Sequence, residues 1–265
     1  MAGLHLKPRA PFATRADLTG ITPSGLAGLS RAEIERLAVP HGAARLPLAE
    51  LFFVESGPDG VLLIEIGDER LDHVGAGLEA GEIIVDGAVG AWAGQGMSGG
   101  VLRIAGSAGA FLGAEMSGGV IELAGHAGER AGGASSGSRR GMSGGLLAIR
   151  GNAGPFLAER QRGGLITVGG AAGEGLATDM IAGTVAVAGG AGPQLGRGMK
   201  RGTVLLHAAP ELPAGFIDTG SHDMIALRLI ARRVPELAGF LGGATHARRI
   251  VGDTLMGGQG EVLVV

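Results

Sequence analysis

Basic side chains recur at neighbouring positions of successive repeats in this sequence, and they are its clearest candidates for binding chemistry. They lie beside a series of methionines, at Arg140, Arg160, Arg162, Arg197, Lys200 and Arg201. If the chain stacks successive repeats, these cations gather on one edge, which suits a polyanionic ligand or an acidic partner surface. The alternative is a solvated charged edge that discourages aggregation between strand edges.

Residues for catalysis or metal binding form no recognisable pattern. The seven histidines are scattered, without an i, i+4 pair or a carboxylate at metal-ligand spacing, and the chain has no cysteine. The sequence contains neither a GxSxG nucleophile motif nor a GxxxxGK phosphate loop. We therefore expect no catalytic residue, no metal site and no bound cofactor in this chain.

One motif resembles a dinucleotide site but has the wrong context. Residues Gly94 to Gly99 read GQGMSG, which fits GxGxxG. A dinucleotide site needs that run to follow a strand and open a helix. Here it precedes the apolar segment GVLRIAG, so we assign its glycines to the repeat.

Five methionines occupy the same position in successive repeats: Met97, Met116, Met142, Met180 and Met199. Gln161 occupies that position in the repeat between Met142 and Met180, and Leu78 occupies it in the repeat before Met97. A soft-metal site is the functional alternative, but such sites usually draw on cysteine. We expect a flexible apolar plug stacked at a corner of the fold.

The elements that must position these residues repeat along the chain. Seven segments of the type GVLRIAG begin at glycines 81, 100, 119, 145, 164, 183 and 202, so the steps are 19, 19, 26, 19, 19 and 19 residues. A repeat of this length with one short strand is one turn of a coil, and such turns bury a core only by stacking. The fold class is therefore all-β, a right-handed parallel β-helix of about seven turns.

Each turn alternates apolar and other residues, as in a strand with one face inward. We expect inner residues such as Ile104, Leu123 and Ile149 to stack in aliphatic ladders. The residues one place after the opening glycine then form an outward apolar strip of Val101, Val120, Leu146 and Leu165. Because such strips mark contacts between subunits, we predict that another chain covers this face.

Glycines recur nine residues into the turns, as at Gly90 and Gly109. They predict either positive φ or a backbone packed too closely for a Cβ atom.

The step of 26 residues places seven extra residues between His126 and Gly141. These predict a surface loop, which is either a tolerated insertion or part of a binding face.

The flanks do not follow the repeat, so we divide the chain into an N-terminal cap (1–61), the coil (62–210) and a C-terminal cap or docking segment (211–265). Ser30 and Glu33 predict a capped helix over residues 31–39. Strands are expected over 51–55 and 61–66, joined by the turn GPDG. Ser221 predicts a helix over 222–234, ended by Pro235, and residues 261–265 predict a terminal strand.

The composition of the chain argues against two classes of partner, nucleic acid and membranes. A net charge of −3 and 3% aromatic residues give no reason to expect nucleic acid. No apolar run approaches membrane-spanning length, and the N-terminus lacks a signal-peptide core, so we expect a cytoplasmic protein without membrane contact.

The repeat as a whole, as in GVLRIAGSAGAFLGAEMSGG, resembles the GXGXG β-helix family over about residues 62–210. Two groups in that family are similar: the C-terminal domain of the glutamate synthase large subunit, and the C-type subunit of formylmethanofuran dehydrogenase with its bacterial relative in the formyltransferase/hydrolase complex. The separate N-terminal cap favours the second group, and a glutamate-synthase-like amidotransfer protein is the alternative.

The resemblance implies a scaffold subunit without catalytic residues, in a complex with subunits of the A, B and D types. That complex moves a formyl group from formyl-tetrahydromethanopterin to a methanofuran-type carrier and releases formate during formaldehyde oxidation. A partner subunit would hold the metal-dependent hydrolase. A polyglutamyl tail on the carrier would be a polyanionic ligand for the basic edge.

Overall fold

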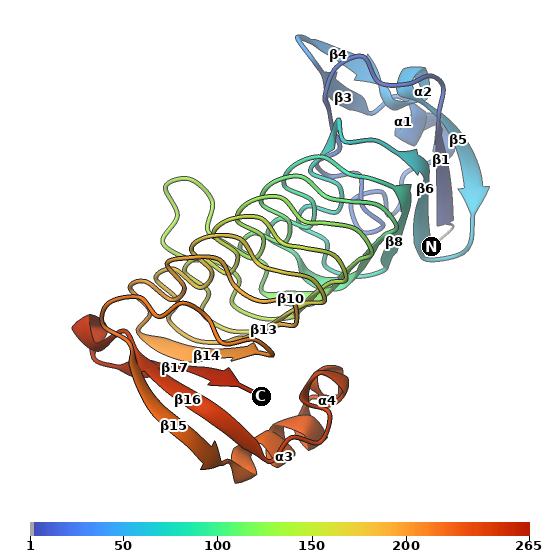
Figure 1. The fold of residues 1–265 in the computed structure, drawn as a ribbon. Coiled ribbons are helices and arrows are strands. Elements are labelled where there is room, and N and C mark those ends of the chain that lie inside the picture. Colours follow the sequence, from blue (N-terminus) through green and yellow to red (C-terminus); the bar gives the residue numbers. More distant parts are fainter. Residues whose placement is uncertain (1–2) are drawn as a thin grey trace.

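The computed structural model describes residues 3–265 and is mostly β-structure, with a 13-stranded and a 4-stranded sheet. Figure 1 shows a long coil with a cap at each end. The long sheet contains β1 (Gly3–Pro8), β5 (Phe52–Gly57), β6 (Val61–Gly67), β8 (Glu82–Gly87), β9 (Ser98–Ile104), β10 (Gly118–Leu123), β11 (Leu146–Ile149), β12 (Leu165–Val168), β13 (Thr184–Val187), β14 (Arg201–Leu206), β15 (Ile217–Asp223), β16 (His246–Gly252) and β17 (Gln259–Val264). The small sheet contains β2 (Ala16–Asp17), β3 (Ala38–His41), β4 (Ala44–Pro47) and β7 (Leu71–Asp72). The helices are α1 (Arg31–Glu35), α2 (Leu48–Leu51), α3 (Ile225–Arg233), α4 (Pro235–Leu241) and the 3₁₀ turn η1 (Thr254–Met256).

Strands β6 and β8 to β14 lie side by side in parallel, each paired with the strand of the next repeat. Ile104 pairs with Leu123, and Leu123 pairs with Ile149, so these three side chains stack as expected. All three are at most 2% exposed. Burying a side chain of this size contributes about 1.5–3 kcal/mol, and the stacked turns supply what a single short strand cannot.

The methionine column is the apolar plug that the sequence predicts. All five of its methionines are fully buried in the core, as are Leu78 and Gln161. The Nε2 group of Gln161 donates to the carbonyl oxygens of Gly163 and Gly164, at 3.0 and 3.2 Å. Its Oε1 atom is buried without a hydrogen-bond partner.

The recurring glycines at place nine are explained by close backbone packing. At Gly109 an added Cβ atom would lie 2.8 Å from the backbone nitrogen of Ala91 and the carbonyl carbon of Gly90. Positive φ occurs instead at the opening glycines of the repeats, such as Gly119 at 81°. The two glycine columns therefore serve different needs, one of space and one of conformation.

The N-terminal cap differs from expectation in two places. Helix α1 has the predicted capping box between Ser30 and Glu33, but it ends at Glu35 and not at residue 39. Pro40 disfavours helix in the residue before it, and this segment pairs instead in strand β3. Strands β5 and β6 both form, but β1 lies between them in the sheet, antiparallel to β5 and parallel to β6.

The C-terminal cap also departs from the prediction. Ser221 caps no helix, because it lies within strand β15, and α3 begins four residues later after Met224. Pro235 does not simply end this helix but occupies the first turn of α4. The terminal strand β17 does form, and it pairs in parallel with β14 at the end of the coil. It thereby covers a strand edge that the last turn would otherwise expose.

Candidate functional site

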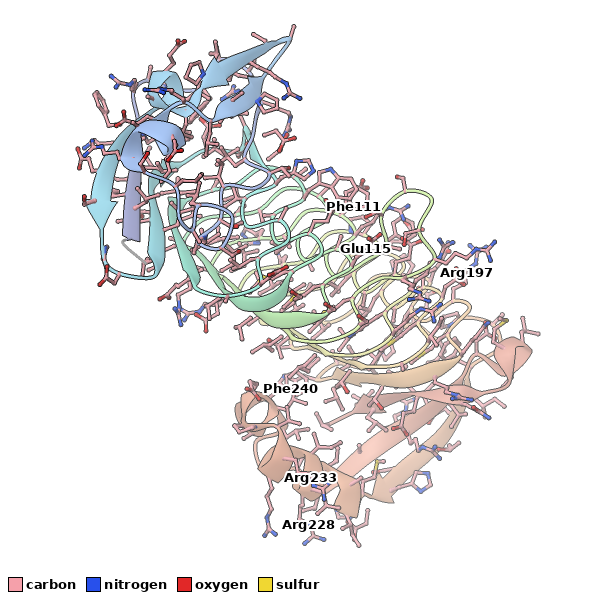
Figure 2. The ribbon with its side chains drawn as sticks, turned by 180° about the vertical axis from the view of Figure 1, so that it is seen from behind. Phe111, Glu115, Arg197, Arg228, Arg233 and Phe240 are labelled. Atoms are coloured by element: carbon pink, nitrogen blue, oxygen red, sulfur yellow. The ribbon has the colours of Figure 1, made fainter. Side chains whose placement is uncertain are left out.

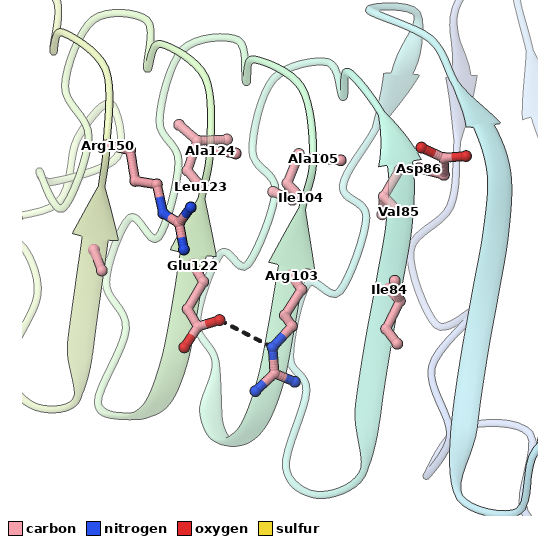
Figure 3. A pocket seen from close by; sticks show the side chains of 11 residues that line it. Ile84, Val85, Asp86, Arg103, Ile104, Ala105, Glu122, Leu123, Ala124 and Arg150 are labelled. Atoms are coloured by element: carbon pink, nitrogen blue, oxygen red, sulfur yellow. Dashed lines mark hydrogen bonds and ion pairs between the residues drawn. The ribbon is translucent and has the colours of Figure 1, made fainter.

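The outer face of the long sheet has a shallow groove across strands β8 to β11, with a volume of about 460 Å³. Figure 3 shows Ala105 and Ala124 between Asp86 and Arg150, beside the pair formed by Arg103 and Glu122. These two small side chains directly follow strands β9 and β10 and leave the groove shallow and open.

Charge in the groove is largely neutralised at its centre. The Nε atom of Arg103 lies 2.9 Å from a Glu122 oxygen, and its guanidinium also pairs with Glu82. The hydrogen bond and charge of Glu122, together with Glu82, raise the pKa of Arg103 above its usual range. This arrangement orders an ion-pair network on the surface but contains no activated nucleophile.

Part of the outward apolar strip is covered by the chain itself. Leu165 packs against a cluster formed by the outer residues of β13, β14 and β17 and by helices α3 and α4. In that cluster Leu205 and Leu263 meet Leu227 and Leu237, all at most 1% exposed. At Leu165 part of the cover comes from the chain itself, and cover of the rest of this face by another chain stays a prediction. Val101, Val120 and Leu146 remain half-buried on the same face.

The predicted basic edge is a mixed surface in the structure. Arg160 lies 3.6 Å from the Asp179 carboxylate and also donates to the carbonyl oxygen of Ser138 at 2.8 Å. Arg201 begins β14 and donates to Gln259, so it belongs to the sheet. Arg140, Arg162, Arg197 and Lys200 are exposed. Figure 2 places Arg197 on the same edge of the coil as Phe111 and Glu115.

The insertion loop, residues 133–141, projects from the coil (Figure 1). Glu115 accepts a hydrogen bond from the backbone nitrogen of Ser135 at 3.1 Å, and Gln95 lies 3.3 Å from the Ser135 hydroxyl. Arg162 reaches the carbonyl oxygen of Arg139 at 3.4 Å. The loop is therefore fixed to the coil near both ends, while the side chains of Arg139 and Arg140 stay exposed.

The structure adds a ladder of rings that the sequence pattern did not lead us to expect. Trp92 and Phe111 stack with ring centroids 3.9 Å apart, and His73 lies 6.2 Å from Trp92. Farther along, Arg130 lies over the ring of Phe156 at 5.0 Å and pairs with the buried Glu159. The three rings, Arg130 and Phe156 share one phase of the repeat and a positive φ, so spacing alone could have revealed them.

The described residues offer no group of three or more His, Asp or Glu side chains that could hold a metal ion. Within residues 3–265 no helix is long and apolar enough to cross a membrane. The GQGMSG run leads directly into strand β9, which begins at Ser98, and no helix follows it.

Comparison with known proteins gives local sequence matches. The chain matches no family model. It is 42% identical over 85 residues to the C-type subunit of the formyltransferase/hydrolase complex Fhc of Methylorubrum extorquens, over 32% of each chain. It is 36% identical over 94 residues to the C-type subunit of the molybdenum-containing formylmethanofuran dehydrogenase 1 of Methanothermobacter thermautotrophicus, over 35% of this chain and 24% of that one. These alignments span a third or less of the curated relatives' lengths.

A solved structure extends the match to the whole chain. It is the X-ray crystal structure of the formyltransferase/hydrolase complex (FhcABCD) from Methylorubrum extorquens in complex with methylofuran. One of its chains matches with a TM-score of 0.92 and 40% identity, over 98% of both chains. This chain belongs to the family of C-type subunits of formyltransferase/hydrolase complexes. The predicted resemblance to the C-type subunit is confirmed, and the glutamate synthase alternative is not favoured.

Proposed function

We propose that this chain is the scaffold subunit, of the C type, in a cytoplasmic formyltransferase/hydrolase complex. The complex would transfer a formyl group from formyl-tetrahydromethanopterin to a methanofuran-type carrier and release formate, as a step of formaldehyde oxidation. The observation that carries this proposal is the structural match to a chain of such a complex over 98% of both chains. Catalysis would belong to the partner subunits.

The scaffold itself would be a right-handed parallel β-helix of about seven turns over residues 62–210. Residues 1–61 would form its N-terminal cap, and residues 211–265 would form its C-terminal cap. Parallel pairing at intervals of one repeat supports this reading, because it is the register that stacked turns require. A rigid coil of this kind can hold several subunits at fixed spacings.

The partners would be subunits of the A, B and D types, one of which holds the metal-dependent hydrolase. Both carriers would bind mainly to those subunits. The relative's complex was solved with methylofuran. The scaffold would serve by positioning the transferase and hydrolase so that one carrier can reach both.

The basic edge would guide the polyglutamyl tail of such a carrier. Arg140, Arg162, Arg197 and Lys200 are exposed, and Arg139 in the insertion loop adds a further exposed cation. Asp179 reduces the charge available from Arg160. Tail binding at such a surface would be electrostatic and therefore sensitive to salt.

The scaffold role is tested by expressing this chain with its A, B and D type partners and measuring the mass of the purified assembly. We expect one complex that contains all four subunits, and loss of that complex when this chain is omitted. A complex that assembles and turns over formyl groups equally well without this chain would contradict the proposal.

The basic edge is tested by replacing Arg160, Arg162 and Lys200 with serine in the assembled complex. Carrier affinity at low salt should fall several-fold, with little change near 0.5 M salt, where exposed charges are screened. The control is Arg45→Ser, which removes an exposed arginine of strand β4 in the N-terminal cap. Equal carrier affinity in the wild-type, edge-variant and control complexes would remove the edge from the binding path.

A further inference from the structure

Helix α3 has two faces of opposite character. Leu227 is fully buried in the cluster that joins the helix to the sheet. On the other side Ile225 and Leu229, one helical turn apart, are 63% and 50% exposed. Large apolar side chains that lie together on an exposed helix face are typical of contact surfaces.

The same exposed side of the helix is basic. Arg228, Arg232 and Arg233 are exposed, and none of the ion pairs found among residues 3–265 includes them. Arg232 and Arg233 lie in the last turn, where they favour the helix dipole. Arg228 has no such role, and Figure 2 shows it at the end of the molecule remote from the coil.

Neighbouring arginines in the same cap behave differently. Arg248 of β16 lies 2.5 Å from Asp218, and Arg249 lies 3.1 Å from Glu261. Hydrogen bonding from Arg248 lowers the pKa of Asp218 below its ordinary value. The cap thus neutralises the arginines on its sheet and leaves those on α3 available.

We infer that the outer face of α3, defined by Ile225, Arg228, Leu229 and Arg232, is a docking surface for an acidic, partly apolar patch on a partner subunit. This inference rests on the proposed role as a scaffold subunit. The two apolar side chains would supply the anchors, and the arginines would select a negatively charged partner.

A protein partner suits this face better than a lipid surface does. The helix has only nine residues, and part of its apolar surface is already used inside the chain. Helices that lie in a membrane interface present a long apolar face over many turns. A short anchor with arginines around it is the size of one contact within a protein–protein interface.

The test uses full-length variants in the assembled complex of all four subunits. In Ile225→Gln/Leu229→Gln the anchors become polar without introducing a helix breaker, and Arg228→Glu reverses one free charge. The readout is the concentration at which the complex dissociates on dilution, followed by mass photometry at low and high salt. We expect the double variant to dissociate at a concentration at least about tenfold higher at both salt levels.

For Arg228→Glu we expect a several-fold weakening at low salt that shrinks as salt is raised. Leu29→Gln and Arg45→Glu are matched controls, since both change exposed residues of the N-terminal cap. Both should leave dissociation unchanged. Circular dichroism and thermal unfolding of each free chain verify that the variants fold.

The outcomes separate this inference from the scaffold proposal. If the wild-type chain enters no complex, the scaffold proposal fails. If wild-type and α3 variants enter the complex with equal affinity, only the docking surface is overturned. It is also overturned if sedimentation shows that α3 mediates self-association, or if the chain binds phosphatidylglycerol vesicles through this helix.

Discussion

The inner ladder of the coil and the outer face of α3 use the same kinds of side chain in opposite surroundings. Ile104, Leu123 and Ile149 are at most 2% exposed, whereas Ile225 and Leu229 are 63% and 50% exposed. Burial in the ladder holds the fold together because every turn adds to one hydrocarbon column. On α3 the apolar side chains are exposed, so their surface is free to stabilise a contact with another molecule.

The comparison predicts its largest effect in the ladder. Leu123→Ala should destabilise the chain by about 2–5 kcal/mol, because neighbouring turns cannot close the cavity. The matched change Leu229→Ala should alter stability by less than about 0.5 kcal/mol. Urea denaturation of both variants measures the difference, and similar losses for both would break the distinction between the two regions.

A second prediction contrasts two glycines. At Gly109 an added methyl group meets backbone atoms at 2.8 Å, so Gly109→Ala should cost about 1–3 kcal/mol. At Gly239, inside α4, nothing lies within 4 Å, and Gly239→Ala should stabilise by about 0.4–1 kcal/mol. Thermal unfolding distinguishes the two signs. A neutral Gly109→Ala would mean that the stacked turns can move apart.

A third prediction contrasts two positions of the methionine column. Gln161→Met removes the unpaired Oε1 atom but also two hydrogen bonds, so stability should change by less than about 1 kcal/mol. The reverse exchange, Met142→Gln, should cost about 1–3 kcal/mol, because it buries a new polar group. Denaturant midpoints measure both, and a large loss in Gln161→Met would assign the glutamine a specific structural role.

Sequence reasoning succeeded where the chain repeats itself. The strands, the aliphatic ladders and the methionine plug follow from a fixed interval, and pairing such as Ile104 with Leu123 confirms them. Sequence reasoning failed where helix and strand compete for the same segment. Ser221 has the sequence of a helix cap, but the pairing of β15 with β16 takes it into a strand. Local preference is weak compared with a row of sheet hydrogen bonds.

The candidate surfaces show the same division. Repeat spacing placed the basic residues near one another in the sequence pattern, and it also places Asp179 one repeat of 19 residues after Arg160, with which it pairs. It could not show that the cluster containing residues of α3 and α4 would pack against Leu165 and not against Val101. That packing joins segments without a fixed sequence interval between them.

The sequence by itself determined the period, the buried face of each strand and the family, because stacking identical turns needs only one-dimensional information. Tertiary structure decided which outer surfaces remain free. Helices α3 and α4 return along the sheet and bury Leu227 and Leu237, and that packing leaves Ile225 and Leu229 outside. Whether these residues are buried or exposed depends on where strands distant in the sequence lie in space. The spacing of residues along the chain does not give that information.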